Sequence, residues 1–433
     1  DGQLDVHRLE EALTSVIRRH EPLRSVVGNS PDGGIIVTLD APRESLPMSD
    51  FSSLATEEHS EALASLVQRE QTRAFDLATE RPLRALLTRR SENSHALVIT
   101  LHHIAVDGMS LATVLRDLAT FYGGSEPTRL RTTFHAYANW QRRYWTSERL
   151  SERATFWRER LRGAPLELEL PVDHTPSPRA GQVGGMVLRE LDAQILSAMS
   201  ALAQSERASL FMLMLAAYAA VLHRQSGQRD VIIGTPLHGR EQSELTDLVG
   251  MFVNQLPLRV NIPPGASLRD VLRVAREQAL ACMSPHEMPF GEIVEALGGA
   301  RDTGRNPVFQ VLLNVLPAIG EANGVSAGGV TFSLPGLKET FALFDGQAKF
   351  DMTLYVVPSR NDLQLALVYD ADRFRAERMT TLLEDVASVL REGVTAPDVP
   401  LEQLSVFRQD AKFAASSPWA RTDHGIDAAS VPE

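Results

Sequence analysis

The hydrophobic and polar positions of this chain follow two periods, which together predict a mixture of helices and strands. Residues 4–27 carry apolar side chains at the spacing of one helix face before Pro22, which disfavours a helical residue ahead of it, so a helix and then a strand are expected. Residues 57–75 predict another helix. Short apolar or alternating runs predict strands at residues 33–40, 83–89 and 96–103.

The second half of the chain repeats this alternation after a change in composition. Residues 170–185, "LPVDHTPSPRAGQVGG", are rich in Pro, Gly and small polar residues and indicate a boundary between two lobes near residue 175. Helices are then predicted within residues 196–227, 264–283 and 378–393, and strands within 230–236 and 363–374. The chain is therefore expected to be an α/β protein of two lobes.

Composition narrows the range of partners. Of the 433 residues, 43% are hydrophobic and 23% are charged, which is typical of a folded globular protein. The formal net charge of -12 argues against a general nucleic-acid or anionic-membrane surface and favours proteins or small molecules. With no charged leader and no apolar run of membrane-spanning length, a cytoplasmic protein is expected. The single cysteine, Cys282, excludes an internal disulfide and is predicted to be a packed thiol.

Two adjacent histidines end an apolar run in the segment "LHHIAVDGMS". Adjacent side chains of a strand point to opposite faces, so one of His102 and His103 is expected to be buried and the other available. The apolar spacing that follows predicts a helix starting near Ser110, which places the pair on a strand-to-helix loop. Asp107 is expected to stabilise this loop through backbone N–H groups or a distant arginine, and Gly108 to adopt backbone angles closed to other residues.

Three functions of the histidine pair are open on these residues alone. The pair can be structural, it can bind a metal, or one imidazole can act in acyl transfer as base or hydrogen-bonding partner of a nucleophile. A metal site is disfavoured because opposed side chains are poor co-ligands and no H-E-x-x-H or cysteine cluster accompanies them. We therefore expect no metal.

The segment "HHIAVDG", residues 102–108, resembles the HHxxxDG signature of the condensation domains of nonribosomal peptide synthetases, within the superfamily of chloramphenicol acetyltransferase-like acyltransferases. Further segments resemble the other motifs of this family in the expected order. They are "RHEPLR" (19–24), "YANW" (137–140), "GTPLHGR" (234–240), "VGMFVNQLPLR" (249–259), "HEMPFGEIVEAL" (286–297), "RDTGRNPVFQVLLN" (301–314) and "KFDMTLYV" (349–356). The resemblance extends from about Leu4 to Leu404.

Some positions depart from the family pattern. The family's opening S-x-A-Q-x-R-like helix has no counterpart, because the chain begins at "DGQLDVHRL". Ala138 and Asn139 stand where the family more often has an acidic residue and an aromatic one. Gln255 replaces the usual Thr, and Gly291 the usual Glu. We assign no function to these positions.

The resemblance implies two chloramphenicol acetyltransferase-like lobes, arranged in a V with a tunnel between them. The expected ranges are 1–172 and 173–410 for the lobes and 411–433 for a tail or linker. The tunnel would receive the phosphopantetheine arms of an upstream and a downstream carrier domain, and an adjacent adenylation domain is a further candidate partner. The domain itself would bind no cofactor and would work as a monomeric module.

The resemblance also assigns roles to single residues. The second histidine of the signature faces the reaction centre, which implies that His103 is catalytic and His102 structural. Asp107 is implied to pair with Arg305 of the "RNP" segment, and the amide of Gly108 to help bind an oxyanion. The residues expected to line the tunnel are Asn254, Met109 and Ser110.

The implied activity is formation of an amide between a carrier-bound acyl or peptidyl thioester and the amine of a downstream carrier-bound aminoacyl thioester. One alternative is a stand-alone acyltransferase that forms an ester or amide with a free alcohol or amine. A second is a non-catalytic domain that recruits another enzyme. The continuation "DGMSLAT" disfavours epimerisation, and the two histidines exclude the aspartate pair of heterocyclisation domains. Donor, acceptor and product are left open by the sequence.

Overall fold

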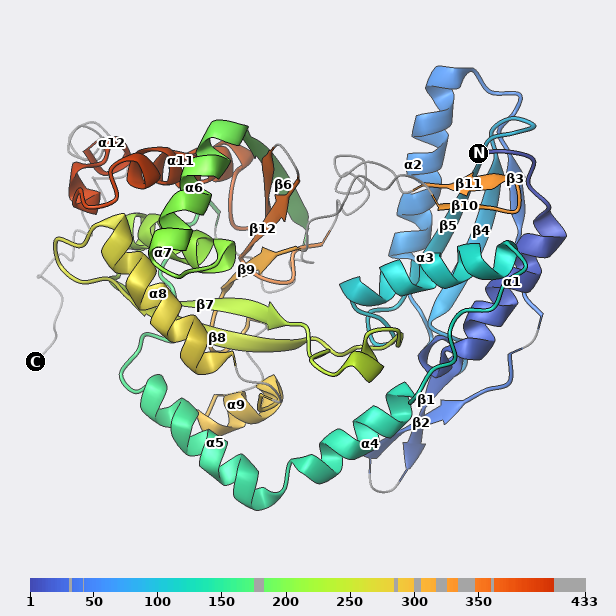
Figure 1. The fold of residues 1–433 in the computed structure, drawn as a ribbon, viewed down its shortest axis with the longest axis horizontal. Helices are drawn as coiled ribbons and strands as arrows, with labels where there is room; N and C mark the ends of the chain where they lie inside the picture. Colours follow the sequence, from blue (N-terminus) through green and yellow to red (C-terminus); the bar gives the residue numbers. More distant parts are fainter. Residues whose placement is uncertain are drawn as a thin grey trace, which may run out of the picture.

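Two lobes lie side by side in the computed structural model, joined along one side by α4 and α5 (Figure 1). The structure describes residues 1–30, 33–41, 43–174, 183–283, 287–299, 305–316, 325–333, 347–359 and 362–408. The expected tail, residues 411–433, lies outside this range. Every helix and strand predicted above from periodicity is confirmed.

The first part of the chain supplies most of one lobe and the two connecting helices. Its elements are α1 (Val6–Arg19), η1 (Glu21–Arg24), β1 (Ser25–Ser30), β2 (Gly33–Thr38), β3 (Met48–Asp50), α2 (Thr56–Thr72), β4 (Leu83–Arg89), β5 (His95–Leu101), α3 (Gly108–Tyr122), α4 (Phe134–Tyr144) and α5 (Ser147–Arg160). Strands β3, β4 and β5 form one sheet in that order, and β1 and β2 form a separate hairpin. Helices α1 and α3 pack together and place the apolar face of α1 in the core.

The remaining elements build the second lobe around a larger sheet, except for one hairpin that lies on the first lobe. They are β6 (Gly184–Leu191), α6 (Ala193–Ser205), α7 (Leu210–Ser226), β7 (Asp230–Leu237), η2 (Ser243–Leu245), β8 (Asn254–Asn261), α8 (Leu268–Cys282), α9 (Phe290–Ala296), β9 (Val311–Val315), β10 (Val325–Ala327), β11 (Val330–Phe332), β12 (Met352–Pro358), β13 (Leu363–Asp370), α11 (Ala376–Thr395), η3 (Leu401–Gln403) and α12 (Ser405–Arg408). The six-stranded sheet has the order β6-β13-β12-β9-β7-β8, in which β9 runs parallel to both neighbours.

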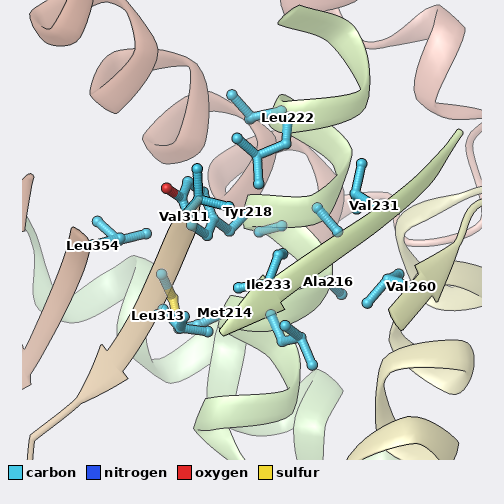
Figure 2. Packing of buried hydrophobic residues seen from close by; sticks show 14 of the residues in the cluster. Met214, Ala216, Tyr218, Leu222, Val231, Ile233, Val260, Val311, Leu313 and Leu354 are labelled. Carbon is cyan, nitrogen blue, oxygen red and sulfur yellow. The ribbon is translucent and has the colours of Figure 1, made fainter. Parts of the chain in front are cut away.

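Helix α7 is the centre of the second core. Its residues from Leu213 to Leu222 are all buried, so the helix is apolar on every face, as expected for a helix enclosed by other elements. Figure 2 shows its side chains packed against Val231, Ile233 and Val311 of the sheet. Cys282 is fully buried in this cluster, which confirms the packed thiol.

The hairpin β10–β11 comes late in the chain but lies on the first lobe, against α3 and beside the N-terminus (Figure 1). Val330 is 4% exposed within the first core, and the Phe332 ring meets the Tyr122 ring edge-on at 5.4 Å. The backbone of Asp1 accepts a hydrogen bond from the N–H of Thr331 at 2.8 Å. A segment more than 300 residues along the chain thus completes the lobe that the N-terminus begins.

The two cores do not divide at residues 172/173. Trp157 of α5 is fully buried among residues of the second lobe, because α5 packs against α9, whereas Val330 belongs to the first core. The ranges 1–172 and 173–410 therefore describe chain halves rather than packing units. Part of the expected boundary, residues 175–182, lies outside the described residues.

Among the described residues, no single helix is long and apolar enough to cross a membrane. Helices α6 and α7, bent by 103° at their junction, meet that test of length and composition only as a pair.

Two buried tyrosines provide a matched test of hydrogen bonding in the cores. The Tyr218 hydroxyl has no hydrogen-bond partner among the described residues, and its burial raises its pKa, whereas the Tyr122 hydroxyl accepts from the Asp5 N–H at 3.0 Å. We expect Tyr218→Phe to leave the free energy of unfolding unchanged or raise it, and Tyr122→Phe to lower it by about 1 kcal/mol. Urea unfolding of both variants checks this; a clear loss of stability in Tyr218→Phe would contradict it.

Candidate active site

The histidine pair lies on a tight turn between β5 and α3. Strand β5 ends at Leu101, and the turn is closed by hydrogen bonds from the His102 N–H to the Pro82 carbonyl and from the Ala105 N–H to the His102 carbonyl, both 3.0 Å. Within it the His102 ring is half-buried and His103 is exposed. The two imidazoles thus occupy different surroundings, as expected. The reason differs from the expected one: both residues follow the strand, and the turn, not the alternating faces of a strand, directs their side chains apart.

His102 is held as part of the turn. Its Nδ1 accepts a hydrogen bond from the Ile104 N–H at 3.1 Å, and its ring meets the Phe75 ring edge-on at 5.8 Å. Burial, followed by the charges of His103 and Lys349, lowers the pKa of His102. An Nδ1 that accepts a hydrogen bond carries no proton, so the neutral tautomer with a proton on Nε2 is the one that fits this turn.

Asp107 ends the turn and starts the next helix. It is 1% exposed, and its Oδ1 accepts from the Ser110 N–H at 2.9 Å, which makes it the N-cap of α3. Because of this cap the helix begins at Gly108, two residues before the predicted start. Oδ2 accepts from the Phe252 N–H at 3.1 Å, which ties the turn to the loop before β8.

Asp107 pairs with Arg240, not with Arg305. The Arg240 Nη2 lies 2.6 Å from Asp107 Oδ1, whereas the Arg305 Nη2 lies 2.6 Å from Asp351 Oδ2. The prediction that Asp107 pairs with Arg305 was therefore wrong, although Asp107 does form an ion pair with another arginine of the second lobe. Arg240 belongs to the "GTPLHGR" segment, where we had assigned it no role.

The Arg240 guanidinium is almost fully enclosed. Its side chain is 5% exposed, it stacks on the Phe252 ring at 4.1 Å, and Nη1 donates to the carbonyls of Leu245 and Leu248 at 3.2 and 2.9 Å. The preceding Gly239 has a φ of +66°, and a side chain there would lie 2.5 Å from the Phe252 carbonyl oxygen. In the sequence, the pair Gly239–Arg240 was the signal that could have indicated a backbone turn followed by a buried arginine.

Ser110 binds both Asp107 and Arg240 and does not line a tunnel. It is fully buried, and its hydroxyl accepts from Arg240 Nη2 at 2.9 Å and from the Gly250 N–H at 3.1 Å. Gly250 is required there, because a Cβ would lie 2.1 Å from the Phe134 ring. Asp107, Ser110 and Arg240, which we call the lobe-joining network, connect the two lobes directly beneath the histidine turn.

The remaining predictions for site residues concern Asn254, Met109 and Gly108. Asn254 is not free to line a tunnel, because its Nδ2 donates to the Met288 carbonyl at 2.8 Å and its Oδ1 accepts from the Phe290 N–H at 2.9 Å. Met109 is half-buried on α3. Gly108 is exposed and helical rather than left-handed, so its predicted special backbone angles are wrong. Nothing lies within 4 Å of a Cβ built on it, which leaves the start of α3 open to a ligand.

No group of three or more His, Cys, Asp or Glu side chains is placed to hold a metal ion in the part of the chain that the structure describes. The chemistry available at the turn is that of an exposed imidazole, an open helix N-terminus and a rigid support beneath them.

Comparison with known proteins identifies the family. The family model of the condensation domain matches residues 1–413, and the chain therefore belongs to the condensation domain family. It is 33% identical over 437 residues to the phosphinothricin tripeptide synthetase PhsC of Streptomyces viridochromogenes, covering 96% of this chain and 39% of that protein. It is 28% identical over 424 residues to bacitracin synthase 1 of Bacillus licheniformis, covering 98% of this chain and 8% of that protein.

Solved structures agree with this assignment. The X-domain from teicoplanin biosynthesis superimposes with a TM-score of 0.81 at 28% identity, over 93% of this chain and 90% of that one. The first condensation domain of the calcium-dependent antibiotic synthetase gives 0.73 at 21% identity, over 94% and 92%, which supports the two-lobed fold. The chain thus has the extent of a single domain, while the synthetases that it resembles are much longer.

Proposed function

We propose that this chain joins a carrier-bound acyl or peptidyl thioester to the amine of a carrier-bound aminoacyl thioester, with formation of an amide. The observation that carries the proposal is the exposed His103 imidazole on a turn whose base is fixed by the lobe-joining network. Rigid support of this kind is what positioning of two reactants requires. The synthetase relatives, which assemble peptides by name, support the same class of reaction.

The chemistry follows from the reacting groups. A free α-amine has a pKa of about 7.7–8.0, so a useful fraction is neutral near pH 7 and needs orientation more than deprotonation. Its nitrogen attacks the thioester carbonyl, and a tetrahedral intermediate with a cationic nitrogen forms. His103 takes the proton from that nitrogen, the C–S bond breaks, and the proton passes to the departing thiolate. The exposed Gly108 N–H at the start of α3 would stabilise the oxyanion.

The partners in this proposal are an upstream and a downstream carrier domain, each presenting its substrate on a phosphopantetheine arm. An adjacent adenylation domain would load the carriers. The domain would supply no cofactor of its own and act as a monomeric module.

A single assay tests this function. The protein is incubated with an acyl-loaded carrier and then offered a carrier-bound amine, a free amine or a free alcohol, and the products are identified by mass spectrometry. We expect an amide with the carrier-bound amine and little product with the free acceptors. Product with a free amine or alcohol alone would replace the proposal with a stand-alone acyltransferase.

A recruitment function is the second candidate, because the X-domain from teicoplanin biosynthesis, which resembles this chain, has also been solved in complex with OxyB. Absence of product with every acceptor, from protein that is folded by circular dichroism, would favour recruitment. The complete "HHIAVDG" signature argues for catalysis.

A further inference from the structure

Helices α4 and α5 together form a bent connection between the two lobes, residues 134–160, which we call the strut (Figure 1). One end lies on the first lobe, where the His135 Nδ1 of α4 is 3.2 Å from the Glu21 Oε2 of η1. The other end is anchored in the second lobe, because Trp157 of α5 is fully buried there and its Nε1 donates to the Glu287 Oε1 at 3.1 Å. With both ends held, the bend between the two helices sets how far apart the lobes stand on this side.

The bend itself is a short link between two helices. Helix α4 ends at Tyr144 and α5 begins at Ser147, so only Trp145 and Thr146 lie between them. Each residue of such a link has two soft backbone dihedrals, which leaves the angle between the helices variable unless side chains fix it. No residue of α4 is fully buried, so a hydrophobic core does not hold this half of the strut in place.

Arg149 provides the contact across the bend. It lies in the first turn of α5, and its Nη1 donates to the Tyr144 carbonyl of α4 at 2.8 Å, while its guanidinium carbon lies over the Tyr144 ring at 4.4 Å. The same carbonyl accepts the Thr146 N–H at 3.0 Å, and the Tyr144 ring stacks on the Trp140 ring at 5.1 Å. A cation is favoured at the negative end of the α4 dipole and over an aromatic face. One arginine of α5 thus binds both the backbone and the side chain of the last residue of α4.

A second connection between the lobes has a geometric consequence. The lobe-joining network, with its Asp107–Arg240 pair, fixes the lobes to each other beneath the histidine turn. A single contact still allows hinge rotation of the lobes about it, whereas a second contact at a distance opposes that rotation. Figure 1 shows the junction of α4 and α5 at the outer edge of the molecule, away from the start of α3. The strut is therefore placed to oppose a change in the angle between the lobes.

We propose that Arg149 is a positioning residue: by binding the end of α4 from the first turn of α5, it fixes the bend of the strut and with it the separation of the lobes. Its kinetic consequence rests on the proposed function, in which two carrier-bound substrates meet at the histidine turn, since their reaction requires a defined geometry. Its effect on the lobes does not depend on activity.

The first experiment measures the distance between the lobes by double electron–electron resonance on spin labels. Ser65→Cys on α2 and Ser197→Cys on α6 place the labels at exposed positions, and both helices lie on the opposite side of the molecule from the strut (Figure 1). The native Cys282 is fully buried and should remain unlabelled, which the protein without the two new cysteines verifies.

In this doubly labelled protein, Arg149→Met is expected to broaden the distance distribution and shift its mean. The matched control is Arg143→Met, which removes the same charge from the last turn of α4, where Arg143 is exposed and forms no hydrogen bond or ion pair with any described residue. Arg143→Met should leave the distribution as in the wild type. An unchanged distribution in Arg149→Met, or equal broadening in both variants, would overturn the proposal.

The second experiment measures amide formation with both carriers loaded. In Arg149→Met we expect kcat to fall about threefold because the substrates are less well aligned, and KM for each loaded carrier to stay unchanged. The thermal midpoint should change little in either variant, because both arginines are exposed. A raised KM with unchanged kcat would indicate that Arg149 binds a carrier and would contradict the proposal. A broader distance distribution in a protein that forms no amide would instead overturn the proposed function and leave the effect of Arg149 on the lobes in place.

Discussion

His103→Ala is expected to reduce amide formation by about 10²- to 10⁴-fold, the range typical of a lost acid–base group, without loss of stability. The exposed imidazole forms no hydrogen bond with the described residues, whereas His102 beside it forms one with Ile104. The measurement is single-turnover condensation with both carriers loaded, together with thermal unfolding of the variant.

His102→Ala is the matched comparison for this substitution. It removes the acceptor of the Ile104 N–H and should therefore affect both the thermal midpoint and the rate. An unaltered condensation rate in His103→Ala would remove His103 from the mechanism.

Asp107→Ala is expected to lower the free energy of unfolding by about 3–5 kcal/mol, because it leaves the Arg240 guanidinium buried without its carboxylate. The substitution also removes the N-cap of α3, a contribution of about 1 kcal/mol. Urea denaturation measures the loss, and a retained unfolding midpoint would show that the network does not support the fold.

Double variants show which arginine is energetically coupled to Asp107. Asp107→Ala and Arg240→Met act on one contact, so their combined effect should be well below the sum of the two single effects. Arg305→Met acts on the separate contact with Asp351 and should be additive with Asp107→Ala. Additivity with Arg240 and coupling with Arg305 would restore the pair expected from the family resemblance.

Local pattern was enough to predict α1, α2, α3, α7, α8 and α11, most of the strands that flank them and the place of the histidines, whereas the connecting helices α4 and α5 were not predicted. Each of these depends on neighbours in the sequence: the apolar faces of α1 and α8, or the strand runs that end at the turn. The partner of Asp107 could not be predicted in the same way. Arg240 and Arg305 are both arginines of the second half of the chain, and only folding decides which of them comes within 2.6 Å.

The prediction that Ser110 and Asn254 line the tunnel was wrong for a different reason. Ser110 and Asn254 are polar residues in motif segments, and a polar side chain can serve a substrate or the backbone equally well. Here the Asn254 amide binds the backbone of Met288 and Phe290, and Ser110 completes the lobe-joining network. One local signal was available, since Asp107 followed three residues later by a hydroxyl is the arrangement of a helix N-cap.

The hairpin β10–β11 has a consequence for synthesis on the ribosome. Val330 fills part of the core that Leu9 and Leu13 begin, and Thr331 pairs with the backbone of Asp1. The first lobe therefore cannot be finished until Val330, more than 300 residues after Leu13, has been translated, although domains generally fold in order as they emerge. In the interval the core lacks the packing that Val330 and Phe332 supply in the finished lobe, and exposed apolar surface of this kind favours aggregation.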